Sequence, residues 1–421
     1  MISFKFVKPD KKSLALQNQG VDVQQQIAQF SDNGLLQAAD AYFARFTTDS
    51  IQYKKPFSDP AQSPTLAMHL GIILQAADLF RGAEVLDFGC STGWLSLGLA
   101  QMGCDVIGVD VAPSALKLAE RLKSTRRVRS DGAMDFHLYD GYRLPLGDAS
   151  VDRIVCFDAF HHVRDQAATL KEFARVLKVG GRIAFMEPGP EHSKTIESQT
   201  EMRRYKVIEN DINLSKISEI AAQTGLMPPV ALIQFQQPQQ LSFAEFQQWS
   251  TKGIGIKRSQ ALLKALVNQM TDTQCFYLQK GVTQMDSRQL TSLGGELRLH
   301  SLERESVAGL PGLKFTITLR NTGTGKWLTE NQKAGQIRLG VQLLTSEEAL
   351  LNLDYARFSL DSAPIDIGRE CQVTGVVRLP AKDAYMLRFD IVAENVAWFG
   401  QQGRSIPLTF TSQELKEKQL L

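Results

Sequence analysis

Between residues 84 and 187, short apolar runs alternate with amphipathic stretches of helical period. Such runs predict strands, and apolar residues recurring at three- and four-residue spacing predict helices between them. The predicted strands are Glu84–Phe88, Asp105–Val109, Met134–Tyr139, Val151–Phe157 and Arg182–Glu187, and the predicted helices are Trp94–Gln101, Pro113–Lys123 and Gln166–Leu177. This alternation predicts an α/β fold built on a doubly wound, Rossmann-like parallel sheet.

The flanking segments extend this domain in both directions. Residues 1–61 predict a helical segment that acts as a lid, followed by an extended connector broken by Pro56, Pro60 and Pro64. A helix is predicted over Thr65–Phe80. After residue 191 the pattern is helical again, and two further strands are predicted at Val230–Phe235 and Cys275–Gly281 with a helical pair over Gln240–Gln269 between them.

After about residue 285 the helical pattern nearly disappears. Several segments alternate apolar and polar residues with period two, which is typical of an antiparallel β-sandwich. These strands are Leu297–Leu302, Lys314–Leu319, Gln336–Leu343, Cys371–Leu379 and Met386–Ala393, whereas the last residues predict a frayed tail. The expected domains are therefore residues 1–61, 62–285 and 286–412.

Composition narrows the class of protein. The 421 residues are 43% hydrophobic and 22% charged, which excludes global disorder. A net charge of +2 argues against a chain-wide nucleic-acid surface, so we expect no nucleic-acid partner. No apolar run of about 18 residues predicts a membrane span. Five scattered cysteines and the lack of a secretory pattern predict a cytoplasmic protein.

The stretch from Glu84 to Asp110 reads EVLDFGCSTGWLSLGLAQMGCDVIGVD. A glycine-bearing turn joins a strand to a helix, and the next strand ends in a carboxylate that can accept hydrogen bonds from both hydroxyls of a ribose. A nicotinamide dinucleotide fold would need G-x-G-x-x-G, but Ser91 and Trp94 stand at the second and third glycine positions.

The pattern fits D-x-G-x-x-x-G better and resembles the first motif of class I S-adenosylmethionine-dependent methyltransferases. Ser91 replaces the middle glycine of the usual D-x-G-x-G-x-G. Three further segments resemble the same family in the expected order, namely Tyr139-Asp140-Gly141, Arg143–Val163 (RLPLGDASVDRIVCFDAFHHV) and Leu170–Phe185 (LKEFARVLKVGGRIAF). The resemblance covers roughly residues 62–281, because CFYLQKG is similar to the family's last, antiparallel strand.

The resemblance implies S-adenosyl-L-methionine as the cofactor and a set of residues around it. Backbone near Gly89–Gly93 meets the methionyl and ribose parts, Asp110 takes the ribose hydroxyls, and Val111 packs on adenine. The expected cofactor-binding residues are Asp87, Gly89, Cys90, Ser91, Gly93, Trp94, Asp110, Val111, Asp140, Gly141 and Asp158. Tyr53 and Lys55 either touch the ligand or belong to a surface connector.

If the acceptor is a hydroxyl, a base must remove its proton. His161, directly after the fourth strand, is the first candidate, and His192, in the loop after the fifth strand, is the second. His162 is interpreted as a structural or cofactor-side residue, and Glu187 and Glu191 are weaker candidates. The six histidines form no cluster of short spacing, so no metal site is expected.

Residues 290–410 resemble a small β-sandwich found next to glycosyltransferases and at the C-terminus of some O-antigen exporter ATPases. The features are Leu319–Gly323 with Trp327, Arg378–Pro380 and Met386–Phe399. The resemblance implies a domain that recognises or presents glycan. Trp327 and Trp398 either stack on sugar faces or belong to the core of the sandwich.

The first hypothesis is thus a methyltransferase of polysaccharide biosynthesis that O-methylates a sugar hydroxyl of a cell-surface glycan or its precursor. The second is a methyltransferase for a small-molecule or lipid-like acceptor, in which the sandwich makes a homodimer. The third is a non-catalytic glycan-binding scaffold, against which the acidic residues Asp87, Asp110 and Asp140 argue.

Overall fold

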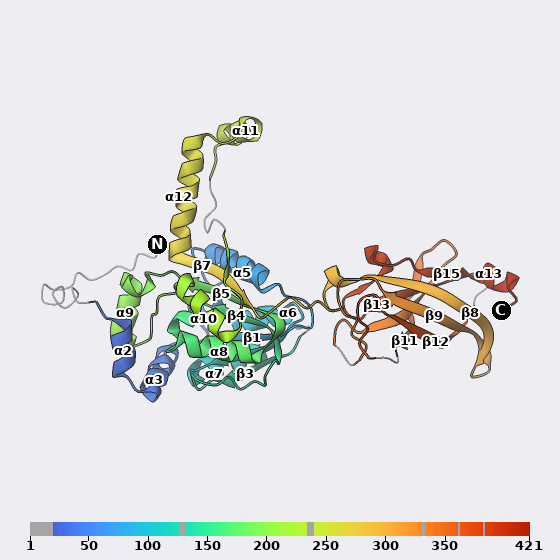
Figure 1. Cartoon of the computed structure of the whole chain (residues 1–421), viewed down its shortest axis with the longest axis horizontal. Helices are drawn as coiled ribbons and strands as arrows, with labels where there is room; N and C mark the ends of the chain where they lie inside the picture. Colours follow the sequence, from blue (N-terminus) through green and yellow to red (C-terminus); the bar gives the residue numbers. More distant parts are fainter. Residues whose placement is uncertain (1–19, 126–131, 234–239, 331–332, 361–362, 382–383) are drawn as a thin grey trace. The chain divides into compact units, whose positions relative to one another are not determined.

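The computed structural model describes residues 20–125, 132–233, 240–330, 333–360, 363–381 and 384–421. It divides into two compact units, one formed by residues 1–79 and 84–282 and the other by residues 80–83 and 283–421 (Figure 1). The boundaries that the sequence predicts at residues 61 and 412 remain predictions.

The first unit is built on a seven-stranded sheet in the order β3-β2-β1-β4-β5-β7-β6. Strands β1 to β5 are parallel, whereas β7 pairs antiparallel with both β5 and β6. The strands are β1 (Glu84–Phe88), β2 (Asp105–Asp110), β3 (Met134–Leu138), β4 (Val151–Phe157), β5 (Leu177–Pro188), β6 (Val230–Leu232) and β7 (Thr273–Gln279). The doubly wound α/β fold predicted from the sequence is confirmed.

Helices connect these strands and supply the rest of the core. Phe173 of α8 and Ile217 of α10 are fully buried against Ile154 and Phe185 of the sheet. The connecting helices are α5 (Ser63–Ala77), α6 (Trp94–Gln101), α7 (Pro113–Thr125), α8 (Gln166–Val176), α9 (Ile196–Tyr205) and α10 (Leu214–Thr224). Short 3-10 turns over Phe160–His162 and His192–Lys194 follow β4 and β5.

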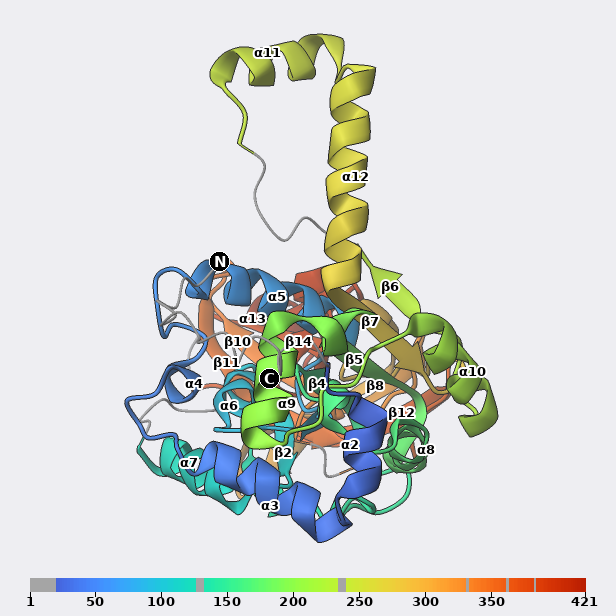
Figure 2. The same cartoon turned by 90° about the vertical axis from the view of Figure 1, so that its left-hand side faces the viewer.

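Further helices of this unit lie outside its βαβ framework. The chain ahead of α5 forms α2 (Val23–Gln29), α3 (Asp32–Phe43) and α4 (Ile51–Lys54). Between β6 and β7 the chain leaves the sheet as α11 (Phe243–Lys252) and α12 (Ile256–Asp272), a hairpin that stands off the unit (Figure 2). Every helix in the described ranges is too short or too polar to cross a bilayer.

The second unit is an antiparallel β-sandwich with a core of its own. One sheet has the order β12-β9-β8, and the other has the order β11-β10-β13-β14 with β15 on β13. The elements are β8 (Gly295–Val307), β9 (Leu310–Asn321), β10 (Ile337–Leu344), β11 (Leu350–Ser359), β12 (Glu370–Arg378), β13 (Met386–Ala393), β14 (Ala397–Trp398), β15 (Leu408–Thr411) and α13 (Ser412–Glu417). The predicted sandwich is confirmed.

Two tryptophans of the sandwich belong to its interior. The Trp327 side chain is fully buried and packs edge-to-face on Phe399, and Trp398 is 6% exposed beneath the guanidinium of Arg357. Neither indole therefore presents a face to a sugar, and the alternative that both are core residues holds.

Candidate active site

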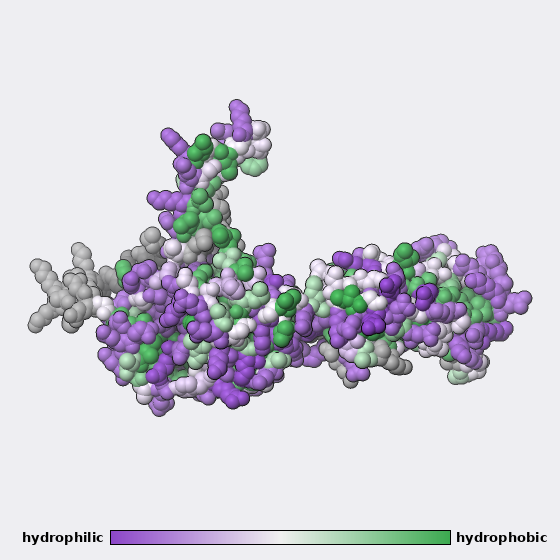
Figure 3. Space-filling model, in the orientation of Figure 1, coloured by the Kyte–Doolittle hydropathy of each residue, from purple (hydrophilic) through white to green (hydrophobic). Residues whose placement is uncertain are grey.

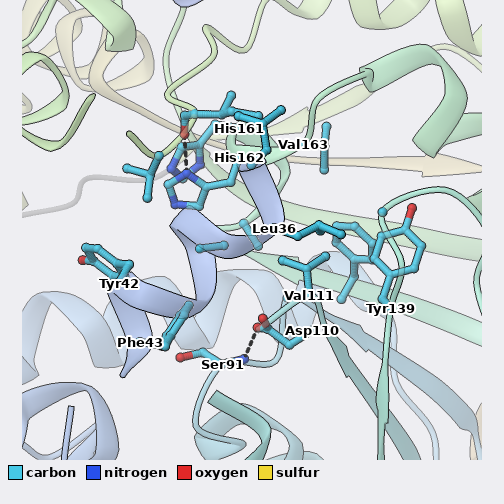
Figure 4. A pocket seen from close by; sticks show the side chains of 18 of the residues that line it. Leu36, Tyr42, Phe43, Ser91, Asp110, Val111, Tyr139, His161, His162 and Val163 are labelled. Carbon is cyan, nitrogen blue, oxygen red and sulfur yellow. Dashed lines mark hydrogen bonds between the residues drawn. The ribbon is translucent and has the colours of Figure 1, made fainter. Parts of the chain in front are cut away.

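A cavity of about 440 Å³ lies where β1 to β4 end at one edge of the sheet (Figure 4). Parallel strands deliver the residues after their carboxyl ends to the same crevice, where ligands bind in open α/β folds. The segments that line it follow four strands and include Gly89 and Ser91 after β1, Asp110 and Val111 at β2, Tyr139 to Tyr142 after β3, and Phe157 to Val163 after β4.

The turn after β1 has the backbone that close approach to a ligand requires. Gly89 has φ of +69°, and a Cβ there would lie 2.4 Å from Ala159 Cβ, so no other residue fits. Ser91 also has a positive φ, of +53°. Its amide donates to Asp110 Oδ2 at 2.9 Å, which couples the turn to the end of β2.

Asp110 is a buried carboxylate at the cavity wall. Its second oxygen, Oδ1, accepts a hydrogen bond from the amide of Ala112 at 2.9 Å. Burial raises the pKa of Asp110 to about 6, although the backbone donors oppose this shift. A carboxylate has about four acceptor sites, so Asp110 keeps capacity to accept a hydrogen bond from a ligand.

Three of the expected cofactor residues lie behind the cavity wall rather than on it. Asp87 is 2% exposed, accepts a hydrogen bond from Ser96 Oγ at 2.5 Å, and has its pKa raised by burial to about 7. Cys90 is a buried thiol, and Gly93 is the N-cap of α6 packed against Phe136. The other eight expected residues, from Gly89 to Asp158, line the cavity.

Helix α3, which precedes α5 in the chain, lines one side of the cavity. The lid role expected of residues 1–61 stays a prediction. Asp40 Oδ1 accepts from the amide of Ser114 at 2.7 Å, and Asp32 forms an ion pair with Arg164. Leu36 lines the cavity near Gly141, where an added Cβ would lie 3.7 Å from Leu36 Cδ2 (Figure 4). Lys55 also lines the cavity, whereas the hydroxyl of Tyr53 faces Thr125.

The first base candidate, His161, is buried and held by a carboxylate. Its Nδ1 donates to Glu187 Oε2 at 2.8 Å, and Glu187 also accepts from the amides of Ala159 and Phe160. Burial favours neutral His161, but the hydrogen bond and charge of Glu187 outweigh it and raise the pKa to about 9. His161 is therefore an imidazolium at neutral pH, which cannot accept another proton.

The second candidate, His192, meets a carboxylate that the sequence pattern does not reveal. His192 Nε2 lies 2.7 Å from Glu209 Oε2, and both residues line the cavity. Glu209 is 5% exposed, and although burial works to raise its pKa, the nearby histidines hold the pKa below the ordinary value. It precedes Asn210, whose amide donates to the His161 carbonyl at 2.8 Å and so brings this loop to β4.

A third histidine completes this end of the cavity. His162 Nδ1 donates to the Ile208 carbonyl at 2.6 Å and lies 3.6 Å from Glu209 Oε1. Within the described ranges, His161, His162 and Glu209 are grouped closely enough to offer a metal three ligand atoms. The sequence predicted no metal site because spacing cannot show this grouping. The expectation of no metal site stays a prediction.

Comparison with known proteins agrees with this geometry. Residues 86–185 match the model of a family described as a methyltransferase domain. Methyltransferase GfsG of Streptomyces halstedii is 34% identical over 159 residues, which cover 36% of this chain and 55% of the relative. A ubiquinone biosynthesis O-methyltransferase of Idiomarina loihiensis is 37% identical over 120 residues, which cover 28% of this chain and 47% of the relative.

The chain spans about half the length of these curated relatives. Among solved structures, phosphoethanolamine N-methyltransferase 2 of Haemonchus contortus, in complex with S-adenosyl-L-methionine, matches with a TM-score of 0.37. That match has 16% identity and covers 63% of this chain and 60% of the other. Residues 86–185 thus match a methyltransferase domain, and the cofactor of this domain is S-adenosyl-L-methionine.

Proposed function

We propose that the protein transfers a methyl group to a hydroxyl of a polar, sugar-like acceptor. The observation that carries this proposal is the polar end of the cavity, where His161, His162 and His192 surround Glu209. This end also holds Glu201 and Asp158, and it lies across the cavity from Asp110. Carboxylates and imidazoles together bind hydroxyl groups and can accept a proton from one of them.

In this proposal the cofactor and the acceptor occupy different halves of the cavity. Asp110 accepts the ribose hydroxyls, the Gly89–Ser91 backbone approaches the methionyl part, and Val111 packs with Leu36 around the adenine. Bound S-adenosyl-L-methionine supplies an electrophilic methyl group on a sulfonium sulfur. Burial works to raise the pKa of Asp158, but His161 and Lys55 hold it below the ordinary value, so Asp158 adds a negative charge near that cation.

The proton of the acceptor hydroxyl goes to His192. Its Nε2–H donates to Glu209, and its Nδ1, which lies 3.4 Å from Ser198 Oγ, accepts the proton in place of that contact. As the new O–C bond forms and the S–C bond breaks, this proton transfer leaves a neutral methyl ether. The negative charge of Glu209 stabilises the resulting imidazolium.

His161 and His192 are both proposed to act, but in different roles. The charged His161 holds Glu187, Asp158 and Glu209 in place, whereas His192 is the base. Cytoplasmic location fits the chain because all five cysteines lie in the described ranges and each is a thiol. A part in polysaccharide biosynthesis rests on the sugar-like acceptor alone.

A second candidate acceptor is a phenolic or lipid-like hydroxyl. The apolar wall that α3 presents favours it, through Leu35, Tyr42 and Phe43. The name of the relative from Idiomarina loihiensis points the same way. Under this alternative the sandwich serves homodimer formation, whereas a scaffold that binds glycan without catalysis is disfavoured by the complete proton-accepting group.

The two candidates separate when the protein is incubated with S-adenosyl-L-methionine and two acceptor panels. One panel holds nucleotide sugars and oligosaccharides, and the other holds catechols and hydroxylated quinols. Mass spectrometry should find a gain of one methyl group on a sugar hydroxyl and formation of S-adenosylhomocysteine. Methylation confined to the phenolic panel would replace the sugar proposal by the second candidate.

A further inference from the structure

The described residues that line the cavity include none from the hairpin of α11 and α12. This hairpin is inserted between the adjacent antiparallel strands β6 and β7, and its base joins the sheet where the amide of Gly189 donates to the Asp272 carbonyl at 3.1 Å. From there α12 runs for 17 residues, about 25 Å at the rise of an α-helix, to the tip that carries α11 (Figure 2).

Both helices are amphipathic, but their apolar faces are open to solvent. In α11, Phe243 and Phe246 are 74% and 58% exposed and share one side with Trp249. In α12, Ile256 and Leu263 are 77% and 62% exposed on one face. Figure 3 shows hydrophobic side chains along this projecting part. An amphipathic helix usually buries its apolar face, so we expect a partner to cover the exposed faces of α11 and α12.

Positive charge surrounds these apolar side chains. The segment 240–272 has four basic residues, Lys252, Lys257, Arg258 and Lys264, against two acidic ones. The carboxylate of Glu245 already accepts hydrogen bonds from the amide and hydroxyl of Ser242, and Asp272 lies at the opposite end of α12 from the tip. The tip is therefore cationic, and the Arg258 guanidinium lies over the Trp249 ring at 6.0 Å.

We propose that this hairpin docks the protein on an anionic lipid surface. Phe243, Phe246 and Ile256 enter the boundary between headgroups and acyl chains, while Lys257 and Arg258 pair with lipid phosphates. Helices with aromatic and aliphatic side chains on one face and lysine or arginine beside them lie in the interface in this way. The hairpin lies on the bilayer and does not span it.

The charge also distinguishes lipid from a second copy of the chain. Two hairpins pairing through their apolar faces would bring the same four cations together, with only Glu245 and Asp272 to offset them. An anionic lipid surface instead attracts each cation that comes close to it. The observations therefore favour a membrane over a dimer as the occupant of this face.

The test is flotation of the full-length protein with two kinds of vesicle. One contains phosphatidylcholine alone, and the other contains phosphatidylcholine mixed with phosphatidylglycerol. We expect binding at least about tenfold tighter to the anionic vesicles, and we expect this binding to weaken as salt screens the charges. Equal binding to both vesicles, or none to either, overturns the proposal.

Matched variants show whether the hairpin carries the binding. Phe246→Glu with Ile256→Glu, and separately Lys257→Glu with Arg258→Glu, should each weaken binding to anionic vesicles at least about tenfold. The controls are Ile406→Glu, at an 86% exposed position in the sandwich, and Lys416→Glu with Lys418→Glu in α13. The controls should bind like the parent.

Two measurements on the same proteins separate lipid binding from misfolding and from dimer formation. Calorimetric titration with S-adenosyl-L-methionine and thermal denaturation should be unchanged in the hairpin variants, because the hairpin lies outside the cavity. Sedimentation equilibrium measures the oligomeric state without vesicles. A parent dimer that the hairpin variants convert to monomers, with vesicle binding unchanged, would assign the face to a second copy and overturn the proposal.

Discussion

At the scale of single residues, the proposed cofactor site depends most on Asp110. Its two oxygens accept hydrogen bonds from the amides of Ser91 and Ala112, and the residue lines the cavity. Asp110→Ala removes both ribose hydrogen bonds, each contributing roughly 1.5–3 kcal/mol when charged. We expect affinity for S-adenosyl-L-methionine to fall at least tenfold in calorimetry. Asp366→Ala, at an exposed site in the sandwich, is the control. Equal affinities in both variants would show that the cofactor does not bind at Asp110.

The second prediction at this scale concerns His192, the proposed general base. Loss of a general base usually costs about 10²–10⁴-fold in turnover, so His192→Ala should lie in that range while cofactor affinity is retained. Glu209→Gln keeps a hydrogen-bonding side chain and should cost less. These rates are measured with whichever acceptor the panels identify. If His192→Ala turns over within a few-fold of the parent, His192 is not the base; if His161→Ala does so as well, no histidine base operates at these positions.

His161 predicts a pH dependence of stability. The folded protein raises the pKa of this histidine from 6.5 to about 9, so the folded state holds the proton more tightly than the unfolded chain. Its contribution to the free energy of unfolding is complete below about pH 6.5 and is lost as pH rises through about 9. Urea unfolding at several pH values should show this loss in the parent and a flatter profile in His161→Gln. Parallel profiles would mean that His161 is neutral when folded.

At the scale of elements, a hydrogen bond holds helix α3, the proposed lid, against α7. The bond from the Ser114 amide to Asp40 ties this helix to the first turn of α7, next to the Asp110 strand. Asp40→Ala should therefore let the lid open more often. We expect roughly three- to tenfold faster dissociation of S-adenosyl-L-methionine in stopped-flow experiments, with little change in melting temperature. Asp22→Ala, at the N-cap of α2, is the control, and a similar rate change there would point to general loosening.

Elements with a strong periodic pattern could be predicted closely. Strand β1 and helix α6 have the bounds expected from the sequence, because the apolar residues Val85, Leu86 and Phe88 and the glycine turn after them mark their ends. Strand β11 could not be predicted because its first five residues are exposed and carry no buried alternation. The frayed tail predicted at the end of the chain is instead helix α13, which a capping box between Thr411 and Glu414 stabilises.

Of the candidate site, the sequence could predict the side of the cavity that Asp110 and Asp140 line. Asp110 and Asp140 follow strand ends, so the topology alone brings them to one edge of the sheet. Glu209 lies in an irregular loop after α9, and a hydrogen bond from Asn210 to the turn after β4 places it beside the histidines. No periodicity in the sequence indicates such a contact. For the same reason sequence spacing could not show which histidine meets Glu187 and which meets Glu209.

At the scale of the whole molecule, two separate cores predict two independently folding parts. Phe173, Phe185 and Phe276 belong to the core of the first unit, whereas Phe315 and Phe389 belong to the core of the sandwich. Each core is enclosed by its own sheet or sheets, as is typical of autonomous domains. Every cavity residue that the proposed chemistry uses lies in the first unit.

A truncated protein of residues 1–282 should therefore remain folded and bind S-adenosyl-L-methionine with an affinity within about threefold of the parent, because no ligand contact is removed. Residues 80–83 belong to the sandwich unit but lie within the truncated chain, so their loss of packing should lower the melting temperature by a few degrees. Calorimetry and thermal denaturation measure the two quantities. Residues 283–421 alone should bind no cofactor. If the soluble truncated protein fails to bind, the sandwich contributes to the cofactor site in a way that the separate cores do not indicate.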